Sequence, residues 1–144
     1  MARALDLARE ALADGDVPVG AVVVDATGAV IGSGRNTRER DGDPTGHAEI
    51  VALREAAAAR GEWRLDGSTL YVTLEPCTMC AGAIVQSRVA HLVFGAWDEK
   101  AGAVGSLWDV VRDRRLNHRP EVTSGLLADE STELLQAFFR DHRM

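Results

Sequence analysis

Hydrophobic and polar residues follow two different periods along this chain, which predicts a mixture of helices and strands. Leu5, Ala8 and Leu12 recur at helical spacing among charged residues, which favours an amphipathic helix over about residues 2–14. Further helices are expected at residues 47–60, at 77–86 and from about 129 onward. Runs rich in β-branched residues predict strands at residues 19–24, 29–31, 69–74, 91–94 and 121–123.

The order of these elements indicates how the strands pair. The first two strands are separated only by Asp25–Gly28, so we expect a hairpin whose second strand loosens at Gly32 and Gly34. The third strand, the helix after it and the fourth strand are joined by short links, which predicts a parallel pair with a crossover helix. We therefore expect an α/β fold in which helices cover both faces of a mixed five-stranded sheet. Residues 35–46 are expected to form a loop that leads to His47.

Length and composition are those of one globular domain. The 144 residues are 46% hydrophobic and 26% charged, so we expect a single domain over residues 1–144. No apolar run approaches the about 18–20 residues that span a bilayer, and residues 1–6 lack the apolar core of a signal peptide. These features predict a cytoplasmic protein without a membrane partner.

The charge pattern bears on nucleic-acid binding in two opposite ways. A net charge of −6 disfavours non-specific binding over the whole surface, because such binding comes from basic side chains that displace counterions from phosphates. A local basic patch is compatible with this net charge. The same basic residues could equally belong to a solvated loop and to a helix end where the helix dipole favours positive charge. The basic residues concerned are Arg112, Arg114, Arg115, His118, Arg119, Arg140, His142 and Arg143.

Four residues in two short motifs carry the chemistry. Cys77 and Cys80 are three residues apart, so they share one face of a helix, and the positive end of its dipole favours thiolates. Together with His47 they provide one imidazole and two thiolates, the ligand set of a zinc site that leaves a fourth position for water. Zinc lowers the pKa of such a water to about 7, and Glu49 could carry its proton. The pattern predicts hydrolytic displacement of an amine from an electron-poor ring carbon.

Each motif alone also fits a simpler site. The C-x-x-C pair could be a redox pair or half of a structural zinc finger, and H-x-E alone is a weak signal. A structural site with two histidines is disfavoured, because His91 lies in a predicted strand and His118 and His142 lie far along the chain. The two motifs together, with Pro76 directly before Cys77 and a helix start predicted at each, favour a catalytic zinc site.

Short segments spread over nearly the whole chain match a known family. They are Val17–Val22, Asp43–Ile50, Leu70–Cys77, Met79–Ala83, Phe94–Ala96, Gly105–Leu107, Asn117–Arg119 and Phe138–Arg140. On these residues the sequence resembles the bacterial tRNA-specific adenosine deaminases, which belong to the zinc-dependent nucleobase deaminases. The resemblance implies a cytidine deaminase-like three-layer α/β/α fold, with Zn²⁺ held by His47, Cys77 and Cys80 and with Glu49 as the catalytic proton carrier.

The same resemblance implies a substrate and its contacts. It implies a homodimer that converts wobble adenosine to inosine in the anticodon stem-loop of an arginine tRNA. Asn36 would bind the flipped nucleoside, Val19 would form a pocket wall and Asp98 would contact the flanking nucleotide. The residues expected on the RNA surface are Asn117, His118 and Arg119. Without the resemblance, Asn36 is an ordinary turn residue and Val19 an ordinary core residue.

Two further positions qualify this likeness. Gly46 stands where the family usually has alanine, and Trp97 stands where the family varies. Phe138 and Phe139 are expected in the core on their pattern alone, although the last helix of the family also borders the anticodon loop.

The expected function is therefore deamination of wobble adenosine in tRNA by zinc-assisted hydrolysis. One alternative is a deaminase of a free base or nucleoside of the guanine or cytosine type, which the acidic net charge supports. Another is a catalytically inactive, zinc-stabilised RNA-binding module. Glu49 counts against the inactive module, because a structural zinc site has no use for it.

Overall fold

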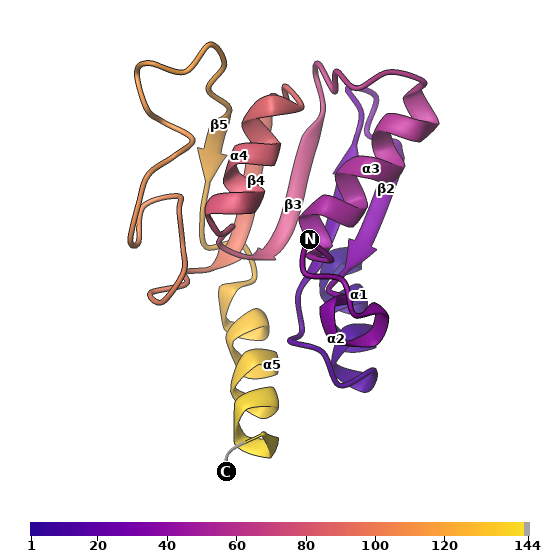
Figure 1. Cartoon of the computed structure of the whole chain (residues 1–144), viewed down its shortest axis with the longest axis vertical. Helices are drawn as coiled ribbons and strands as arrows, with labels where there is room; N and C mark the ends of the chain where they lie inside the picture. The colour runs from indigo at the N-terminus through magenta and orange to yellow at the C-terminus, as the bar shows by residue number, and fades with distance from the viewer. Residues whose placement is uncertain (143–144) are drawn as a thin grey trace.

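The computed structural model describes residues 1–142 and shows one sheet with helices packed against it (Figure 1). None of the helices within these residues combines the length and the apolar character that a membrane crossing requires. The elements in chain order are α1 (Ala2–Ala13), β1 (Gly20–Val24), β2 (Val30–Arg35), α2 (Arg38–Asp41), α3 (Ala48–Arg60), β3 (Thr69–Leu74), α4 (Thr78–Gln86), β4 (His91–Ala96), β5 (Glu121–Thr123) and α5 (Ala128–Asp141).

The sheet is mixed, as the order of the elements predicted. Its five strands lie in the order β2-β1-β3-β4-β5. β1 runs antiparallel to both β2 and β3, which confirms the hairpin. β3 and β4 are parallel and α4 crosses between them, and β5 extends the parallel half.

Helices cover both faces of the sheet, which confirms the three layers. In Figure 1, α3 and α4 lie in front of the strands and α1 lies behind them. The side chains of alternate residues in β1 face the two helical layers in turn. Ala21 and Val23 pack in the large core cluster with residues of α3 and α4, whereas Val22 packs against Ala4 and Leu7 of α1.

The second strand is longer than predicted, because its glycines serve close packing rather than a loose end. β2 continues through Gly32 and Gly34 to Arg35. A Cβ atom on Gly34 would lie 2.7 Å from the carbonyl oxygen of Ala48, at the start of α3. The missing side chains therefore let α3 lie directly on the strand, and this fixes where that helix begins.

The predicted loop before His47 contains a short helix, α2, that sequence periodicity did not reveal. The carboxylate of Asp16 is fully buried and accepts hydrogen bonds from the backbone N–H of Glu39 at 2.7 Å and of Arg40 at 3.1 Å. This buried acceptor satisfies N–H groups of α2 that have no partner within the helix. The segment is thus anchored to the body of the protein.

Only one of the two phenylalanines expected in the core is buried there. Phe138 in α5 is 9% exposed, whereas Phe139 is 50% exposed. Neighbouring residues on a helix point about 100° apart, so both cannot face the sheet. The prediction was wrong for Phe139, which lies at the surface.

Candidate active site

Several strand ends meet at one edge of the sheet. β3 and β4 are parallel and end there at Leu74 and Ala96. Because β1 is antiparallel to β2 and β3, its first residue, Gly20, lies at the same edge, opposite Arg35 at the end of β2. In α/β proteins, ligands often bind at the carboxyl ends of parallel strands. The helices α3 and α4 also begin at this edge.

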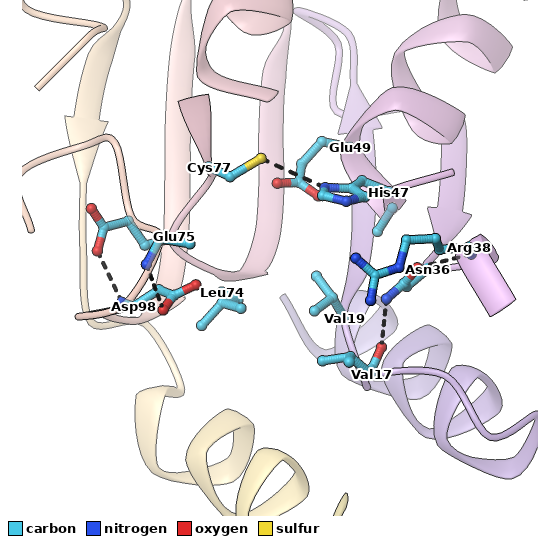
Figure 2. Close-up of a pocket in the computed structure, with 12 residues that line it drawn as sticks. Val17, Val19, Asn36, Arg38, His47, Glu49, Leu74, Glu75, Cys77 and Asp98 are labelled. Carbon is cyan, nitrogen blue, oxygen red and sulfur yellow. Dashed lines mark hydrogen bonds between the residues drawn. The ribbon is translucent and has the colours of Figure 1, made fainter. Parts of the chain in front are cut away.

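The three predicted metal ligands converge from those two helix starts. His47 and Cys77 are the residues that precede α3 and α4, and neither side chain caps its own helix. The Nδ1 atom of His47 lies 3.6 Å from Sγ of Cys77 and 3.5 Å from Sγ of Cys80. All three ligand atoms lie within 4.8 Å of one another, and Figure 2 shows the His47–Cys77 contact.

This spacing fits a tetrahedral zinc ion. With Zn–S bonds of about 2.3 Å and Zn–N bonds of about 2.0–2.1 Å, tetrahedral angles place nitrogen and sulfur about 3.5 Å apart. The distances of 3.6 and 3.5 Å match that value before any metal is added. One imidazole and two thiols also form the donor set of an open, catalytic site rather than a closed structural one.

In the metal-free protein the pKa values of the two cysteines shift in opposite directions. A hydrogen bond from Cys80, together with the contact to His47, lowers the pKa of Cys77 to about 4. The hydrogen bond to Cys77 and burial raise the pKa of Cys80 far above its usual range, and the hydrogen bond to Cys77 raises the pKa of His47. The shared hydrogen bond therefore favours the thiolate form of Cys77 and the thiol form of Cys80, which would lose its proton when metal binds.

Glu49 is a buried carboxyl group beside these ligands. It is the second residue of α3 and 4% exposed, and its carboxylate lies beside His47 and Cys77 (Figure 2). Because His47 has extended rather than helical backbone angles, the rule that residues two apart on a helix diverge does not apply. Burial raises the pKa of Glu49 to about 7, which suits a group that must accept and return a proton near neutral pH.

A cavity of about 170 Å³ opens beside Glu49. This is small compared with the roughly 300–1,000 Å³ of pockets for drug-sized ligands, and it suits a single base. His47, Ala48, Glu49 and Cys77 line it, and its two walls come from opposite sides of the sheet edge. The wall residues are Val17, Val19, Asn36 and Arg38 on one side and Leu74, Glu75, Asp98 and Ala101 on the other.

The predicted substrate residues Val19, Asn36 and Asp98 all line this cavity. The side-chain amide of Asn36 donates to the carbonyl of Val17 at 3.2 Å and accepts from the N–H of Arg38 at 3.1 Å. These bonds hold the amide in one orientation and leave one N–H and one lone pair for a ligand. The contacts of these residues with a substrate stay a prediction.

Glu75 is a wall residue to which no sequence motif assigned a role. It is 2% exposed and accepts hydrogen bonds from the N–H of Asp98 and of Val104, each at 2.9 Å, and of Ser106 at 3.1 Å. The hydroxyl of Ser106 also donates to it. Burial alone would raise the pKa of Glu75, but these hydrogen bonds outweigh burial and lower it. The one available signal was an acidic residue directly before the Pro76–Cys77 motif.

Asn117, His118 and Arg119 lie at the other end of the sheet. His118 hydrogen-bonds through Nε2 to the carbonyl of Val89, just before β4 begins, and β5 starts opposite the first residue of β4. None of the three lines the cavity. Their place on an RNA surface stays a prediction, and the structure puts that surface far from the metal ligands.

Part of the predicted basic patch is paired with nearby acids. Arg112 lies 2.7 Å from a carboxylate oxygen of Asp109, and Arg115 lies 2.6 Å from one of Asp113. These pairs reduce the positive charge that the segment presents. Arg143, the last basic residue of the C-terminal group, lies outside the described residues.

An aromatic groove continues from the cavity toward α5. It shares Asp98 and Ala101 with the cavity and is also lined by Trp97, Lys100 and Phe139. Trp97 and Phe139 are each 50% exposed, and the ammonium of Lys100 lies 5.8 Å from the centre of the Phe139 ring. Trp97 packs edge-on against Phe94 at 4.9 Å between ring centres, which fixes its position.

Comparisons with known proteins agree with this geometry. Residues 1–96 match the zinc-binding region of the cytidine and deoxycytidylate deaminases. The tRNA-specific adenosine deaminase of Haemophilus influenzae is 54% identical over 143 residues, which cover 99% of this chain and 83% of that relative. The chain belongs to the tRNA-specific adenosine deaminase family. Membership of this family, together with the ligand geometry, makes Zn²⁺ its cofactor.

Solved structures of similar proteins share the fold. One, from a study of A-to-I editing by tRNA:A34 deaminases at the wobble position of transfer RNA, superposes with a TM-score of 0.88 at 47% identity. The overlap covers 92% of this chain and 95% of that chain. A guanine deaminase from Nitrosomonas europaea superposes with a TM-score of 0.78 at 31% identity, covering 95% of this chain and 81% of that one. The cytidine deaminase fold expected from the sequence is thereby confirmed.

Proposed function

We propose that this protein converts adenosine to inosine at the wobble position of a tRNA anticodon loop. The observation that carries the proposal is the convergence of His47, Cys77 and Cys80, where His47 and Cys77 line a cavity sized for one base together with Glu49. The relative from Haemophilus influenzae, a tRNA-specific adenosine deaminase, supports adenosine in tRNA as the substrate.

In the proposed mechanism the metal ligands and Glu49 divide the work. Zinc held by His47, Cys77 and Cys80 would supply an activated water at neutral pH. The carboxylate of Glu49 carries two protons in turn from its buried position. It takes the first from the attacking water and gives it to a ring nitrogen of the base, then takes the second from the new C6 hydroxyl and gives it to the amine, which leaves as ammonia. Asn36 and Val19 orient the base, and the cavity accepts it only after it has left the stack.

The aromatic groove supports an RNA loop rather than a free base as the substrate. When one base of a polynucleotide enters the cavity, its neighbouring nucleotides lie on the adjoining protein surface. There Trp97 and Phe139 are each half exposed, and Lys100 offers a cation beside the acidic residues Asp98 and Glu99. Aromatic rings that stack bases, together with cations that meet phosphates, are the usual means of binding single-stranded nucleic acid.

The test is a substrate panel with the zinc-loaded protein. An anticodon stem-loop with adenosine at the wobble position is incubated in parallel with free adenosine, adenine, guanine and cytosine, and products are separated by mass. We expect inosine in the stem-loop and little conversion of the free compounds. Conversion of only a free compound would overturn the proposal.

A second candidate is a deaminase of free guanine. It is favoured by the likeness to the guanine deaminase from Nitrosomonas europaea and by the net charge of −6. The same panel separates the two candidates, because free guanine is one of its substrates.

Further proposals concern the tRNA, the location, the domain extent and the assembly of the protein. We propose an arginine tRNA as the substrate, a cytoplasmic location to match it, and residues 1–144 acting as one deaminase domain.

We also propose a homodimer through the apolar groove between α3 and α4, where Leu53, Ala57 and Trp63 lie and Trp63 is 58% exposed. Light scattering of the protein and of Trp63→Glu tests this. A dimer that the substitution dissociates supports the groove, whereas a monomeric unmodified protein contradicts it.

A further inference from the structure

One buried carboxylate joins the two segments that form a wall of the cavity. Glu75 directly follows β3 and stands two residues before Cys77. All four hydrogen bonds that its side chain accepts come from residues 98–106, which we name the Asp98 loop. Oε1 takes the N–H of Asp98 and the hydroxyl of Ser106, and Oε2 takes the N–H groups of Val104 and Ser106.

The Asp98 loop is also shaped around this carboxylate. The backbone of Gly102 packs so closely against it that a Cβ atom there would collide with both carboxylate oxygens of Glu75. The N–H of Ala103 donates to the carbonyl of Pro76 at 2.8 Å, which adds a second link beside Cys77. The loop therefore takes its path from the carboxylate and from the backbone next to it.

The path of the Asp98 loop affects the shape of the cavity through Asp98 and Ala101. Both residues belong to the loop and line the cavity. The carboxylate of Asp98 accepts hydrogen bonds from the N–H of Lys100 at 3.1 Å and of Ala101 at 3.2 Å, so it is fixed within the loop. In Figure 2 Glu75 turns toward Asp98 and away from His47. Its contacts thus serve the wall and not the metal ligands.

We propose that Glu75 is a positioning residue for the deamination: it clamps the Asp98 loop to the strand that carries Cys77, and so sets the distance between the substrate-binding wall and the metal ligands. This inference rests on the proposed function for its effect on substrate. The clamp itself consists of contacts within the protein and can be tested without substrate.

The chemistry of the clamp requires a carboxylate. Each oxygen of Glu75 receives two donors, so the group must present acceptors at both ends. Glutamine replaces one oxygen with an NH₂ group, and in either orientation that NH₂ faces two donors. The substitution keeps the size of the side chain and loses at least two charge-assisted hydrogen bonds.

The experiment compares the unmodified protein, Glu75→Gln and the control Glu55→Gln, which removes a carboxylate from the exposed side of α3. For Glu75→Gln we expect the KM for the stem-loop to rise by about tenfold or more. The reason is that each lost hydrogen bond to the charged group is worth at least that factor in holding the Asp98 loop in place. We expect kcat to change by less than about threefold. Zinc content should stay at one per chain. Hydrogen exchange should quicken at Val104 and Ser106 but not in α3. Glu55→Gln should change none of these.

A milder variant covers the case in which Glu75→Gln does not fold. Ser106→Ala removes only the hydroxyl donor to Glu75, so we expect a smaller rise in KM and faster exchange in the same loop. Unchanged exchange in the Asp98 loop in either folded variant would overturn the clamp. A loss of kcat with KM unchanged, or a loss of zinc, would overturn the positioning role. If the unmodified protein deaminates nothing, the proposed function fails, and the exchange measurement still decides on the clamp.

Discussion

Glu49 and Glu75 are the same residue type, both almost fully buried at the edge of one cavity, yet their surroundings differ. At Glu49 burial dominates and raises the pKa to about 7. At Glu75 burial is outweighed by four hydrogen bonds, which lower the pKa. The comparison shows that several donors around a carboxylate can outweigh burial and keep it charged, whereas burial that dominates leaves a carboxylate able to exchange a proton near neutral pH.

The largest expected effect comes from removing the exchangeable carboxylate. Glu49→Gln should lower kcat by about 10²–10⁴-fold, the usual contribution of a positioned acid or base. KM and zinc content should change little, because the wall and the ligands are intact. Steady-state kinetics and metal analysis check this, with Glu55→Gln as the matched control on the same helix. Full turnover in Glu49→Gln would remove Glu49 from the mechanism.

The two carboxylates should also give opposite dependence of stability on pH in the metal-free protein. Glu49 has a raised pKa, so its contribution to folding is complete at low pH and is lost as the pH rises through about 7. Glu49→Gln should therefore be more stable than the unmodified protein at pH 8, by on the order of 3 kcal/mol from the shift to about 7, and the difference should shrink at pH 5.

Glu75 should show the reverse. Its pKa is lowered, so its contribution is present above the ordinary carboxyl range and is lost as the pH falls below it. Glu75→Gln should be less stable than the unmodified protein at pH 7, and the gap should narrow in acid. Urea unfolding across this pH range measures both differences. If the stability difference from the unmodified protein had the same sign in both variants, the contrast between the two carboxylates would be contradicted.

The aromatic groove offers a test outside the deep cavity. Trp97→Ala should raise the KM for the stem-loop by about five- to 150-fold, because stacking of a base on an aromatic ring is worth about 1–3 kcal/mol. Activity on free adenosine, if measurable, should not change. Trp108→Ala removes an equally exposed tryptophan that does not line the groove and serves as the control. Equal effects of the two substitutions would exclude the groove from substrate binding.

The smallest effect is expected at the far end of the sheet. Arg119→Ala should weaken binding of the stem-loop by about twofold, and the loss should be larger at low salt than at high salt, since one phosphate contact at most is involved. Binding titrations at two salt concentrations measure it. A loss that does not depend on salt would show that Arg119 acts through the fold and not through phosphate contact.

The sequence was sufficient for the parts of the fold and site that depend on local pattern. Periodicity and β-branched runs located the strands and the long helices, and the strand, helix, strand order predicted the parallel pair. The ligand residues could be grouped because both motifs occur at helix starts, so the two positions converge on one edge of the sheet.

The clamp and the full length of β2 could not be predicted, for two physical reasons. The donors to Glu75 are mostly backbone N–H groups 23 to 31 positions later, and every residue type carries such a group. Gly32 and Gly34 weaken a strand by their own preference, but packing of α3 against their bare backbone overrides it.

The most direct test of the division between the two carboxylates is to measure kcat and KM for the stem-loop with Glu49→Gln and Glu75→Gln side by side. We predict that Glu49→Gln loses kcat and keeps KM, while Glu75→Gln raises KM and largely keeps kcat. Loss of the same parameter in both variants would contradict the assignment of one carboxylate to proton transfer and the other to the cavity wall.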